Sequence, residues 1–239
     1  MSRRPSVSIL VPVYDEAPRL PALFRALGRL RVAAEVIAVD DGSTDGSLEL
    51  LRKRARRSRL FRVLAHPRNR GKGAAIRTAL RASRGRTVVL MDADLECDPR
   101  DIPKLLAVLA RHPGHAVFGT RFPRTSWPTA TRLANHLLTG CTNLLFGAPL
   151  TDMACGFKAL PAARLKALHL EATRFELEAE LTAGLLGQGV PIVEVPVRYR
   201  PRSYGQGKKI HPLDGLRILW RLLLLRLRHP ASPPVRVVR

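Results

Sequence analysis

The feature that most constrains the fold is an alternation of short apolar segments with helical patterns over roughly the first ninety residues. Four apolar segments, the first of them rich in β-branched residues, have the character of buried strands: residues 7–13, 35–39, 61–65 and 87–91. Stretches with apolar residues at helical spacing separate them, at residues 20–30, 47–55 and 73–82. Strands this apolar leave no face for water. The pattern therefore predicts an α/β fold whose mostly parallel sheet has helices on both faces.

The rest of the chain continues the pattern and sets the expected domain organisation. Helical patterns recur near residues 102–110, 130–146, 175–186 and 213–228, and strand-like runs recur near residues 116–119, 154–159 and 192–199. A chain of 239 residues can bury one sizeable core. We therefore expect one domain over residues 1–212, an amphipathic helix over residues 213–228 and a mobile, proline-containing tail over residues 229–239.

The formal charge of +22 arises from 41 Lys and Arg residues against 19 Asp and Glu residues, and it is unevenly placed. Residues 52–86 contain fourteen basic residues and no acid, and the chain from Pro196 onward contains eleven basic residues and one acid, Asp214. Such fields attract polyanions, which include nucleic acids, anionic lipid headgroups and phosphorylated substrates. A compositional bias towards Arg explains the excess equally well.

A basic nucleic-acid-binding protein is therefore one hypothesis, and it rests on charge alone. Aromatic residues make up only 5% of the chain, and no nucleic-acid recognition module is apparent in the sequence. The hypothesis also leaves the acidic residues at strand ends unexplained. We expect no nucleic-acid partner.

Cysteine usage and hydropathy bear on the compartment. Cys97, Cys141 and Cys155 are an odd number without CxxC spacing, which argues against a zinc site or a disulfide framework and suits a reducing compartment. The N-terminal segment has only a short apolar run before Asp15 and Glu16, unlike a secretory signal. No stretch reaches the ~18 apolar residues of a membrane-spanning helix. We expect a cytoplasmic protein.

Polar clusters stand where three of the expected strands end. Tyr14 and Glu16 follow the first strand, Asp41 follows the second, and Asp92 and Asp94 follow the fourth. In open parallel sheets, ligands bind outside the carboxyl ends of the strands. We therefore expect these side chains to line one binding site, and their shared position carries more weight than any single motif.

Asp92 and Asp94 are two residues apart at the end of an apolar strand, so their side chains are expected to point the same way. Two carboxylates on one side cost electrostatic energy unless a cation lies between them. Mg²⁺ or Mn²⁺, shared with substrate phosphates, is the natural occupant, and Glu96 offers a further oxygen. The alternative is a solvated acidic turn. The position after a buried strand favours the metal site.

Two further segments have both a nucleotide-binding and a purely structural interpretation. The carboxylate of Asp41 can accept hydrogen bonds from base or ribose donors, while the DGSTDGS segment that it opens is also typical of helix capping. The NRGKGAA segment, residues 69–75, ends a strand and opens a helix, and its glycines allow the backbone close to a phosphate. It matches neither the Walker loop nor the dinucleotide fingerprint, so alone it is a weak indication.

Six motifs occur in order along the chain: PVYDE, VDDGSTD, NRGKGAA, MDADLE, GTRF and TDMACGFKAL. In this order they resemble the family 2 glycosyltransferases with a GT-A fold, and within that family the polyprenyl-phosphate (dolichyl-phosphate) glycosyltransferases that use mannose or glucose donors. The resemblance runs from Val7 to about Arg221. Its first half is specific to the superfamily, and its second half points to the lipid-phosphate branch.

The resemblance implies a donor site with a role for each matched residue. The residues that would line the base and ribose pocket of a nucleotide-sugar are Pro12, Tyr14, Glu16 and Asp41. A D-x-D-x-(Q/E) metal site is matched by Asp92, Asp94 and Glu96, in which Asp94 and Glu96 would be the direct ligands of Mg²⁺ or Mn²⁺. Asp92 would also contribute to donor binding and catalysis. Glu96 stands where many relatives have Gln.

The resemblance also implies an acceptor side. Lys72 and Arg121 would face donor or acceptor phosphates, and Asp152 would lie near the reacting sugar. A lipid monophosphate is already an anion at neutral pH, so an enzyme that uses it needs cations more than a general base. We expect Arg121, Arg132 and Arg202 to bind the acceptor phosphate.

Residues 199–210 support this expectation. They interleave Arg200, Arg202, Lys208 and Lys209 with Tyr199 and Tyr204, and they are similar to the corresponding segment of polyprenyl-phosphate glucosyltransferases. The alternative is a solvated basic loop, because charge runs are commonly exposed faces.

The helical pattern of residues 213–228 places Asp214, Arg217, Arg221 and Arg228 in one stripe, and apolar residues cover most of the rest. Such a helix is either docked onto the protein's own core or laid against a membrane. Basic residues beside Trp220 and several leucines suit an interfacial helix on an anionic membrane surface. In that case the protein would be peripheral at the inner face of the membrane.

The resulting hypothesis is a metal-dependent, inverting glycosyltransferase that moves a hexose from a UDP- or GDP-sugar to a polyprenyl phosphate, with Asp92, Asp152 and Arg121 as catalytic residues. The runner-up keeps the donor site and uses a glycan or small-molecule hydroxyl acceptor, with Asp152 or Glu176 as general base. The sequence leaves open which base and which sugar the donor carries.

Overall fold

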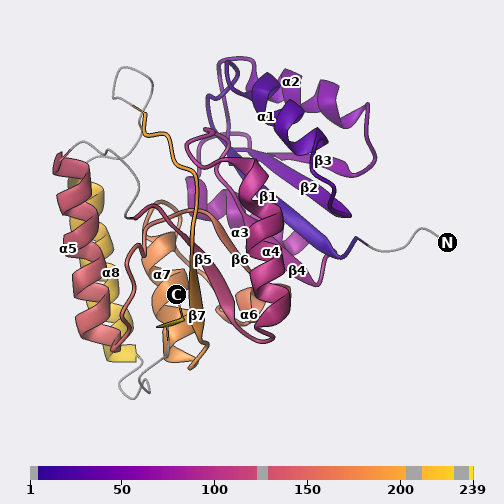
Figure 1. Ribbon diagram of the computed structural model, residues 1–239. Helices are drawn as coiled ribbons and strands as arrows, with labels where there is room; N and C mark the ends of the chain where they lie inside the picture. The colour runs from indigo at the N-terminus through magenta and orange to yellow at the C-terminus, as the bar shows by residue number, and fades with distance from the viewer. Residues whose placement is uncertain (1–4, 123–128, 203–211, 229–236, 239) are drawn as a thin grey trace.

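One sheet forms the centre of the structure, a computed structural model that describes residues 5–122, 129–202, 212–228 and 237–238. Within these residues the sheet has eight strands in the order β3-β2-β1-β4-β6-β5-β7-β8 (Figure 1). The strands are β1 (Val7–Val13), β2 (Ala34–Asp40), β3 (Phe61–Ala65), β4 (Thr87–Leu90), β5 (Ala116–Thr120), β6 (Lys158–Pro161), β7 (Ile192–Pro196) and β8 (Val237–Val238). The predicted mostly parallel sheet is confirmed.

The topology places a switch point between β1 and β4. The chain builds outward from β1 to β2 and β3 and then returns to place β4 on the other side of β1, with all of these pairs parallel. At such a point the connections that follow two neighbouring strands run to opposite sides of the sheet and leave a crevice between them. This crevice is the usual ligand site of such sheets. Residues that follow β1 and β4 therefore start at the point where a ligand is expected.

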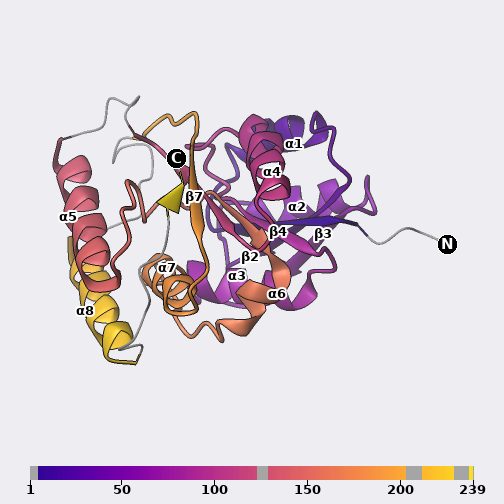
Figure 2. The ribbon, with the colours of Figure 1, turned by 60° about the horizontal axis from the view of Figure 1, so that its bottom comes forward.

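Helices cover both faces of the sheet. They are α1 (Leu20–Gly28), α2 (Ser47–Ala55), α3 (Lys72–Ala82), α4 (Ile102–Arg111), α5 (Thr129–Phe146), α6 (Ala162–Ala167), α7 (Leu177–Gly187) and α8 (Pro212–Arg228), with a short 3₁₀ helix at Pro99–Asp101. Figure 2 shows α1 and α4 on one face and α3, α6 and α7 on the other. Along β1, Ile9 and Val11 join one hydrophobic core and Leu10 joins the other. Alternate side chains of a strand point to opposite faces, so both faces of β1 are buried.

Three segments differ from the sequence-based expectation. The strand expected near residues 154–159 begins only at Lys158, after a turn at residues 153–154 and a bend at Gly156, and it runs antiparallel to both β4 and β5. The sequence pattern also missed the short helix α6. In the tail expected to be mobile, Val237–Val238 pairs with β7 as β8, while residues 229–236 and 239 lie outside the described residues.

The end of β7 also differs, and the difference matters for the site. The strand expected to reach Tyr199 ends at Pro196. Beyond it, the N–H of Val197 still donates to the carbonyl of Thr120 at 3.0 Å, and then Tyr199 bridges to Cys97 in antiparallel fashion. The chain thus changes partner, from β5 to the segment that follows β4.

Helix α8 docks on the protein. It lies beside α5 and packs against α7 (Figure 1), and its residues Ile218, Leu222 and Leu225 are buried in the core. Arg221 pairs with Glu180 of α7 and with Glu171. Other apolar residues of the same helix remain exposed, so docking uses only part of its surface. Among the residues described, no helix combines the length and the apolar character that crossing a bilayer requires.

Two neighbouring leucines of α8 test this docking. Leu222 is fully buried, whereas the side chain of Leu223 is 41% exposed. Replacing Leu222 with Ala is expected to lower the free energy of unfolding by about 2–5 kcal/mol, because the truncation leaves a cavity in the core. The matched Leu223→Ala change is expected to cost less than about 1 kcal/mol. Urea unfolding followed by circular dichroism measures both, and equal effects would contradict the docked position of α8.

Candidate active site

The carboxyl ends of β1, β2 and β4 deliver the predicted acidic residues to one edge of the sheet. Pro12 is half-buried on β1 and Tyr14 half-buried just beyond it, and Glu16 is buried. The Glu16 N–H donates to the hydroxyl of Ser47 at 2.9 Å, which ties this turn to α2. Asp41 follows β2, and the three acids of the DADLE motif follow β4. All of these residues thus lie at one edge of the sheet, and that they line a single binding site remains a prediction.

Asp41 organises the NRGKGAA loop. Its carboxylate accepts hydrogen bonds from the backbone N–H groups of Arg70 at 3.0 Å and Gly71 at 2.7 Å, and it lies 2.6 Å from Nδ1 of His66. Gly71 has a φ of +91°, a conformation that favours glycine. Asp41 therefore joins β2 to the N-terminus of α3, and its contact with a nucleotide remains a prediction.

Asp92 is one end of a buried chain of alternating charges. Lys72 Nζ lies 2.7 Å from Asp92 Oδ1 and 3.0 Å from Glu178 Oε1, and Glu178 also pairs with Lys158, which is fully buried. Burial disfavours the charged form of Lys72, but Asp92 and Glu178 outweigh it and raise the pKa of Lys72. Burial likewise disfavours ionised Glu178, but Lys158 and Lys72 lower its pKa overall. Lys72, expected to face phosphate, here holds Asp92 in place.

Gly156 leaves the space in which Asp92 and Lys72 approach its backbone closely. A Cβ atom at Gly156 would lie 2.4 Å from Asp92 Oδ2 and 2.9 Å from Lys72 Nζ. Any side chain at this position would displace the two groups, so the glycine of the TDMACGFKAL motif has a steric reason.

Asp94 and Glu96 share one arginine. Arg202 donates to Asp94 Oδ2 at 2.8 Å, to Glu96 Oε1 at 3.1 Å and to Glu16 Oε1 at 3.1 Å. Burial raises the pKa of Asp94 to about 7, and repulsion from Asp92 and Glu96 adds to the shift, while Arg202 opposes it. The cluster thus holds more negative charge than it can easily keep, which favours a bound cation. Arg202, expected at the acceptor phosphate, lies instead among the acids.

The donor set fits a cation that shares its ligands with substrate. Within the described part of the chain, no three Asp, Glu, His or Cys side chains are grouped so as to hold a metal ion alone. Mg²⁺ commonly binds through one or two carboxylates together with phosphates and water, and Mn²⁺ accepts the same oxygen ligands. Asp94 and Glu96 meet that requirement.

Arg121 and Asp152 form a buried ion pair in which the carboxylate is saturated with hydrogen bonds. Asp152 accepts from Arg121 Nε at 2.7 Å, from Arg121 Nη2 at 2.8 Å, from the Arg121 backbone at 3.0 Å and from Asn135 at 3.1 Å. Four hydrogen bonds fill the accepting capacity of a carboxylate. Asp152 therefore orients Arg121, whose guanidinium also lies 5.1 Å from the ring centre of Tyr199. This saturation disfavours Asp152 as a general base.

Two adjoining cavities meet at these residues. The smaller, of about 50 Å³, is lined by Asp92, Asp94, Glu96, Cys97, Arg121, Ala154, Gly156, Phe157 and Tyr199. The larger, of about 640 Å³, adjoins it and shares Glu96, Arg121 and Tyr199. The smaller cavity has room for an ion or water and not for a sugar. Arg132, exposed on α5, lines neither of these two cavities, but its guanidinium lies 5.9 Å from the ring centre of Phe122, which lines the larger one.

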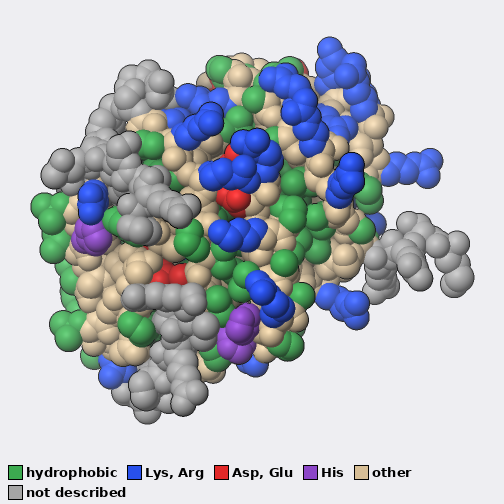
Figure 3. All heavy atoms as spheres, in the orientation of Figure 1, with side chains coloured by type: hydrophobic (Ala, Val, Ile, Leu, Met, Phe, Trp, Pro, Cys, Tyr) green, Lys and Arg blue, Asp and Glu red, His purple; other side chains and the backbone are tan. Residues whose placement is uncertain are grey.

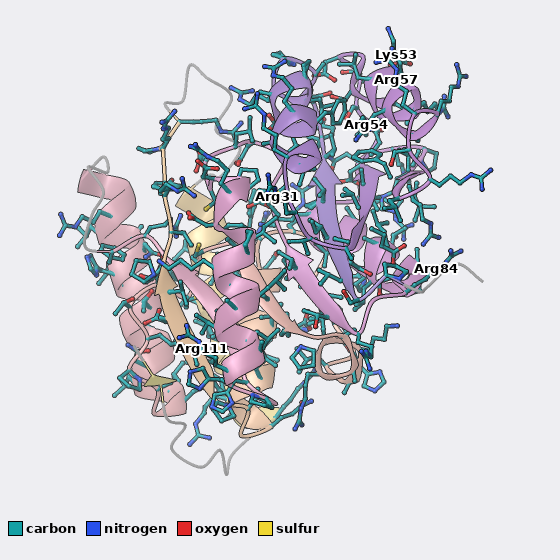
Figure 4. All side chains as sticks on the ribbon, turned by 45° about the vertical axis from the view of Figure 1, so that its right-hand side comes forward. Arg31, Lys53, Arg54, Arg57, Arg84 and Arg111 are labelled. Carbon is teal, nitrogen blue, oxygen red and sulfur yellow. The ribbon has the colours of Figure 1, made fainter. Side chains whose placement is uncertain are left out.

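The basic run over residues 52–86 does not gather at this site. Lys53 of α2 and Arg57 just beyond it are exposed and point outward, while Arg54 lies 5.4 Å from the ring centre of Phe61 (Figure 4). On the face shown in Figure 3, acidic side chains appear only in small groups, and the group in the upper middle lies between Lys and Arg side chains. Lys72 is the member of the run that enters the acidic cluster.

Sequence reasoning missed Glu178 and Lys158 as parts of the site. The active-site helix was expected at Phe175 and Glu176, but its side chain that reaches Lys72 is Glu178, about half a turn further on. The GFK sequence within the last motif contained a signal for Lys158, because a Lys within an apolar strand needs a buried acid as partner. Glu176 keeps one buried oxygen without a hydrogen-bond partner among the described residues.

Comparison with known proteins relates this arrangement to a family. The profile of Glycosyl transferase family 2 matches residues 8–161. The undecaprenyl-phosphate 4-deoxy-4-formamido-L-arabinose transferase of Edwardsiella ictaluri is 32% identical over 213 residues, which cover 84% of this chain and 62% of that protein. The undecaprenyl-phosphate mannosyltransferase of Micrococcus luteus is 30% identical over 214 residues, covering 84% and 86%. The chain thus spans about three fifths of the first relative and most of the second.

A solved structure extends the likeness to the fold. Glucosyl-3-phosphoglycerate synthase from Mycobacterium tuberculosis, in complex with Mn²⁺, UDP-glucose and phosphoglyceric acid, superposes with a TM-score of 0.67. The match covers 97% of this chain and 80% of that one at 21% identity. At this identity the likeness concerns the fold alone. The GT-A arrangement expected from the sequence is confirmed.

The buried charge chain yields a prediction about stability. Glu178→Gln is expected to lower the free energy of unfolding by about 3–5 kcal/mol at pH 7, because it leaves Lys158 buried without its counter-charge. The exposed Glu49→Gln change on α2 is the matched control and is expected to stay within about 0.5 kcal/mol. The pKa of Glu178 in the folded protein lies below its ordinary value of 4.5. The stability that its ionised carboxylate adds is therefore fully present above pH 4.5 and is lost as the pH falls through the folded pKa. Urea unfolding from pH 7 to pH 3 should therefore show a smaller loss of stability for Glu178→Gln than for the wild type; equal losses would contradict the assignment.

Proposed function

The chain belongs to glycosyl transferase family 2, and from this premise we propose that it transfers a hexose from a UDP- or GDP-sugar to a polyprenyl phosphate. One observation carries the proposal: Asp94 and Glu96, suited to a cation, and Arg121, suited to an anion, line one cavity at the switch point of the sheet. A nucleotide-sugar needs the first feature, and a phosphate nucleophile needs the second.

On the donor side, Asp94 and Glu96 would hold Mg²⁺ or Mn²⁺, which when bound neutralises the diphosphate of the leaving nucleotide. Asp92 is held beside them by Lys72. The base and ribose are proposed to lie over Pro12, Tyr14, Glu16 and Asp41, at the ends of β1 and β2. The relatives named above support a nucleotide-sugar donor but leave its base and its sugar open.

On the acceptor side, Arg121 holds the phosphate of the lipid. Asp152 fixes the orientation of this guanidinium, and the pKa of Arg121 stays well above its ordinary value because the pairing with Asp152 outweighs burial. An anionic phosphate oxygen attacks the anomeric carbon while the bond from that carbon to the nucleotide's terminal phosphate oxygen breaks. The configuration inverts, and the nucleoside diphosphate leaves with the electron pair. No general base is needed, in keeping with the saturated Asp152. Arg132 and Arg202 are proposed as further phosphate contacts.

A membrane-facing surface is part of the proposal. The exposed apolar residues of α5 and α8, here called the α5–α8 face, are Leu133, Leu137, Leu144, Leu216, Trp220, Leu223 and Leu227. Within each helix these residues are three, four or seven positions apart, a spacing that places them along one side of the helix. The helices lie side by side (Figure 1), and exposed Arg217 and Arg228 accompany them. Apolar stripes with flanking Arg suit the interface of an anionic membrane, where a polyprenyl phosphate resides.

One observation favours a second candidate, transfer to a hydroxyl acceptor. Such a reaction needs a general base, and Glu176 at the start of α7 keeps a buried oxygen free of hydrogen bonds within the described residues. In this case the product would partition into water and not into organic solvent.

A transfer assay tests the proposed reaction. Labelled UDP- and GDP-sugars are offered with undecaprenyl phosphate and Mn²⁺, and label extracted into organic solvent is measured. We expect transfer with at least one donor, loss of transfer with EDTA and recovery on adding excess Mn²⁺. Asp94→Asn is expected to lower the rate by about 100-fold or more because it removes a metal ligand, while Glu49→Gln retains the rate. Label that stays in the aqueous phase with every donor would refute the lipid acceptor.

Vesicle binding tests the α5–α8 face separately. Leu144 and Leu227 are 86% and 77% exposed, and Leu60, at the far end of the sheet beside β3, is 55% exposed. The double change Leu144→Glu and Leu227→Glu is expected to weaken co-sedimentation with phosphatidylglycerol vesicles several-fold, because it adds charge to the apolar face. Leu60→Glu adds the same kind of charge elsewhere and is expected to have little effect. Equal binding by all three proteins would exclude this face as the docking surface.

A further inference from the structure

Arg202 is the cation that holds the acidic cluster together. Its guanidinium donates to acids from two strand ends, Glu16 after β1 and Asp94 and Glu96 after β4, and its side chain is only 12% exposed. The backbone N–H of Arg202 donates to Glu96 Oε1 as well, at 3.2 Å. The same two carboxylates, Asp94 and Glu96, are the proposed metal ligands.

A short antiparallel pairing brings Arg202 to this position. The Asp98 N–H donates to the carbonyl of Arg198 at 3.1 Å, and the Arg200 N–H donates to the carbonyl of Glu96 at 2.8 Å. The Tyr199 hydroxyl donates to Glu96 Oε2 at 2.8 Å. Both side-chain oxygens of Glu96 therefore accept from the segment of residues 198–202, here called the clasp.

The charges explain why the clasp closes on the acids. Asp92 already has Lys72, and Glu16 also pairs with Arg19 at 3.1 Å. Asp94 pairs with Arg202 at 2.8 Å, and Glu96 pairs with it at 3.1 Å. A buried carboxylate is costly unless a positive charge accompanies it, so Arg202 supplies the charge that a metal would otherwise provide.

We propose that Arg202 is an internal counter-ion that occupies the metal-binding carboxylates and must leave Asp94 and Glu96 before a divalent cation can bind. This inference rests on the proposed function, because it takes these two residues as the ligands. A guanidinium and a divalent cation on the same oxygens repel each other strongly in a site with little water. The two cations therefore compete.

Displacement of Arg202 has a structural consequence. Coordination of Glu96 takes up the oxygens that accept from the Tyr199 hydroxyl and from the Arg202 backbone and Nε, so metal binding loosens the clasp. Tyr199 lines both cavities at the site, and its departure would join the smaller cavity to the larger. The released guanidinium is then a cation beside the incoming phosphates. Loading of the metal and opening of the site for substrate become one event.

Titration of the protein with Mn²⁺ alone, followed by electron paramagnetic resonance of the free ion, tests the competition. Arg202→Gln is expected to bind Mn²⁺ several-fold more tightly than the wild type, because the competing charge is gone. Arg200→Gln is the matched control. Arg200 contacts Glu96 through its backbone N–H, which the substitution keeps, so the affinity of this variant for Mn²⁺ is expected to differ little from that of the wild type. Equal affinities of wild type and Arg202→Gln, equal tightening by both variants, or no Mn²⁺ binding by any form would overturn the proposal.

Hydrogen exchange of the wild type decides the question without a variant. The backbone N–H of Arg202 donates to Glu96 Oε1 and that of Arg200 donates to the Glu96 backbone carbonyl, and both are expected to exchange faster when Mn²⁺ is added and the clasp loosens. Unchanged or slower exchange would show that the clasp stays closed on the loaded site and would refute displacement. Neither measurement contains donor or acceptor. Mn²⁺-driven opening without any sugar transfer would therefore refute the proposed function while leaving this inference intact.

Discussion

The need to neutralise carboxylates that the sheet gathers at one edge fixes much of this structure. Parallel strands bring Glu16, Asp92, Asp94 and Glu96 together, and such a group is stable only with cations between its members. The cations come from distant segments: Lys72 from the start of α3 and Arg202 from beyond β7. Electrostatic compensation therefore positions segments that share no strand pairing in the sheet.

The same requirement extends into the core. Lys72 is shared between Asp92 and Glu178, and Glu178 in turn neutralises Lys158 on β6. The acidic edge is thus connected through alternating charges to the centre of the sheet. A structural pair and a binding site are here one network, so a change at either end alters the other.

Much of the fold could be predicted from local pattern, because the buried strands are apolar and the acids follow them directly. The positions of β1, β2, β3 and α3, and those of Asp41 and Asp94 after β2 and β4, needed no more than that. The contacts of Lys72 with Glu178 and of Arg202 with Asp94 join residues 106 and 108 positions apart, and no local pattern contains them. The sequence pattern placed β6 too early in the chain, because a strand of four residues is too short to show a clear alternation of apolar and polar side chains.

The antiparallel strand β6 also sets the order in which the sheet can be assembled. Strand β4 has β1 on one side and β6 on the other, although β5 comes between β4 and β6 in the chain. During synthesis, β1 to β4 can pair as soon as they emerge, but the second edge of β4 can pair only after residues 158–161 have been synthesised. An open strand edge is a template for pairing with another chain. The half of the sheet that forms the acidic site therefore keeps one edge of β4 unpaired until residues 158–161 have been synthesised.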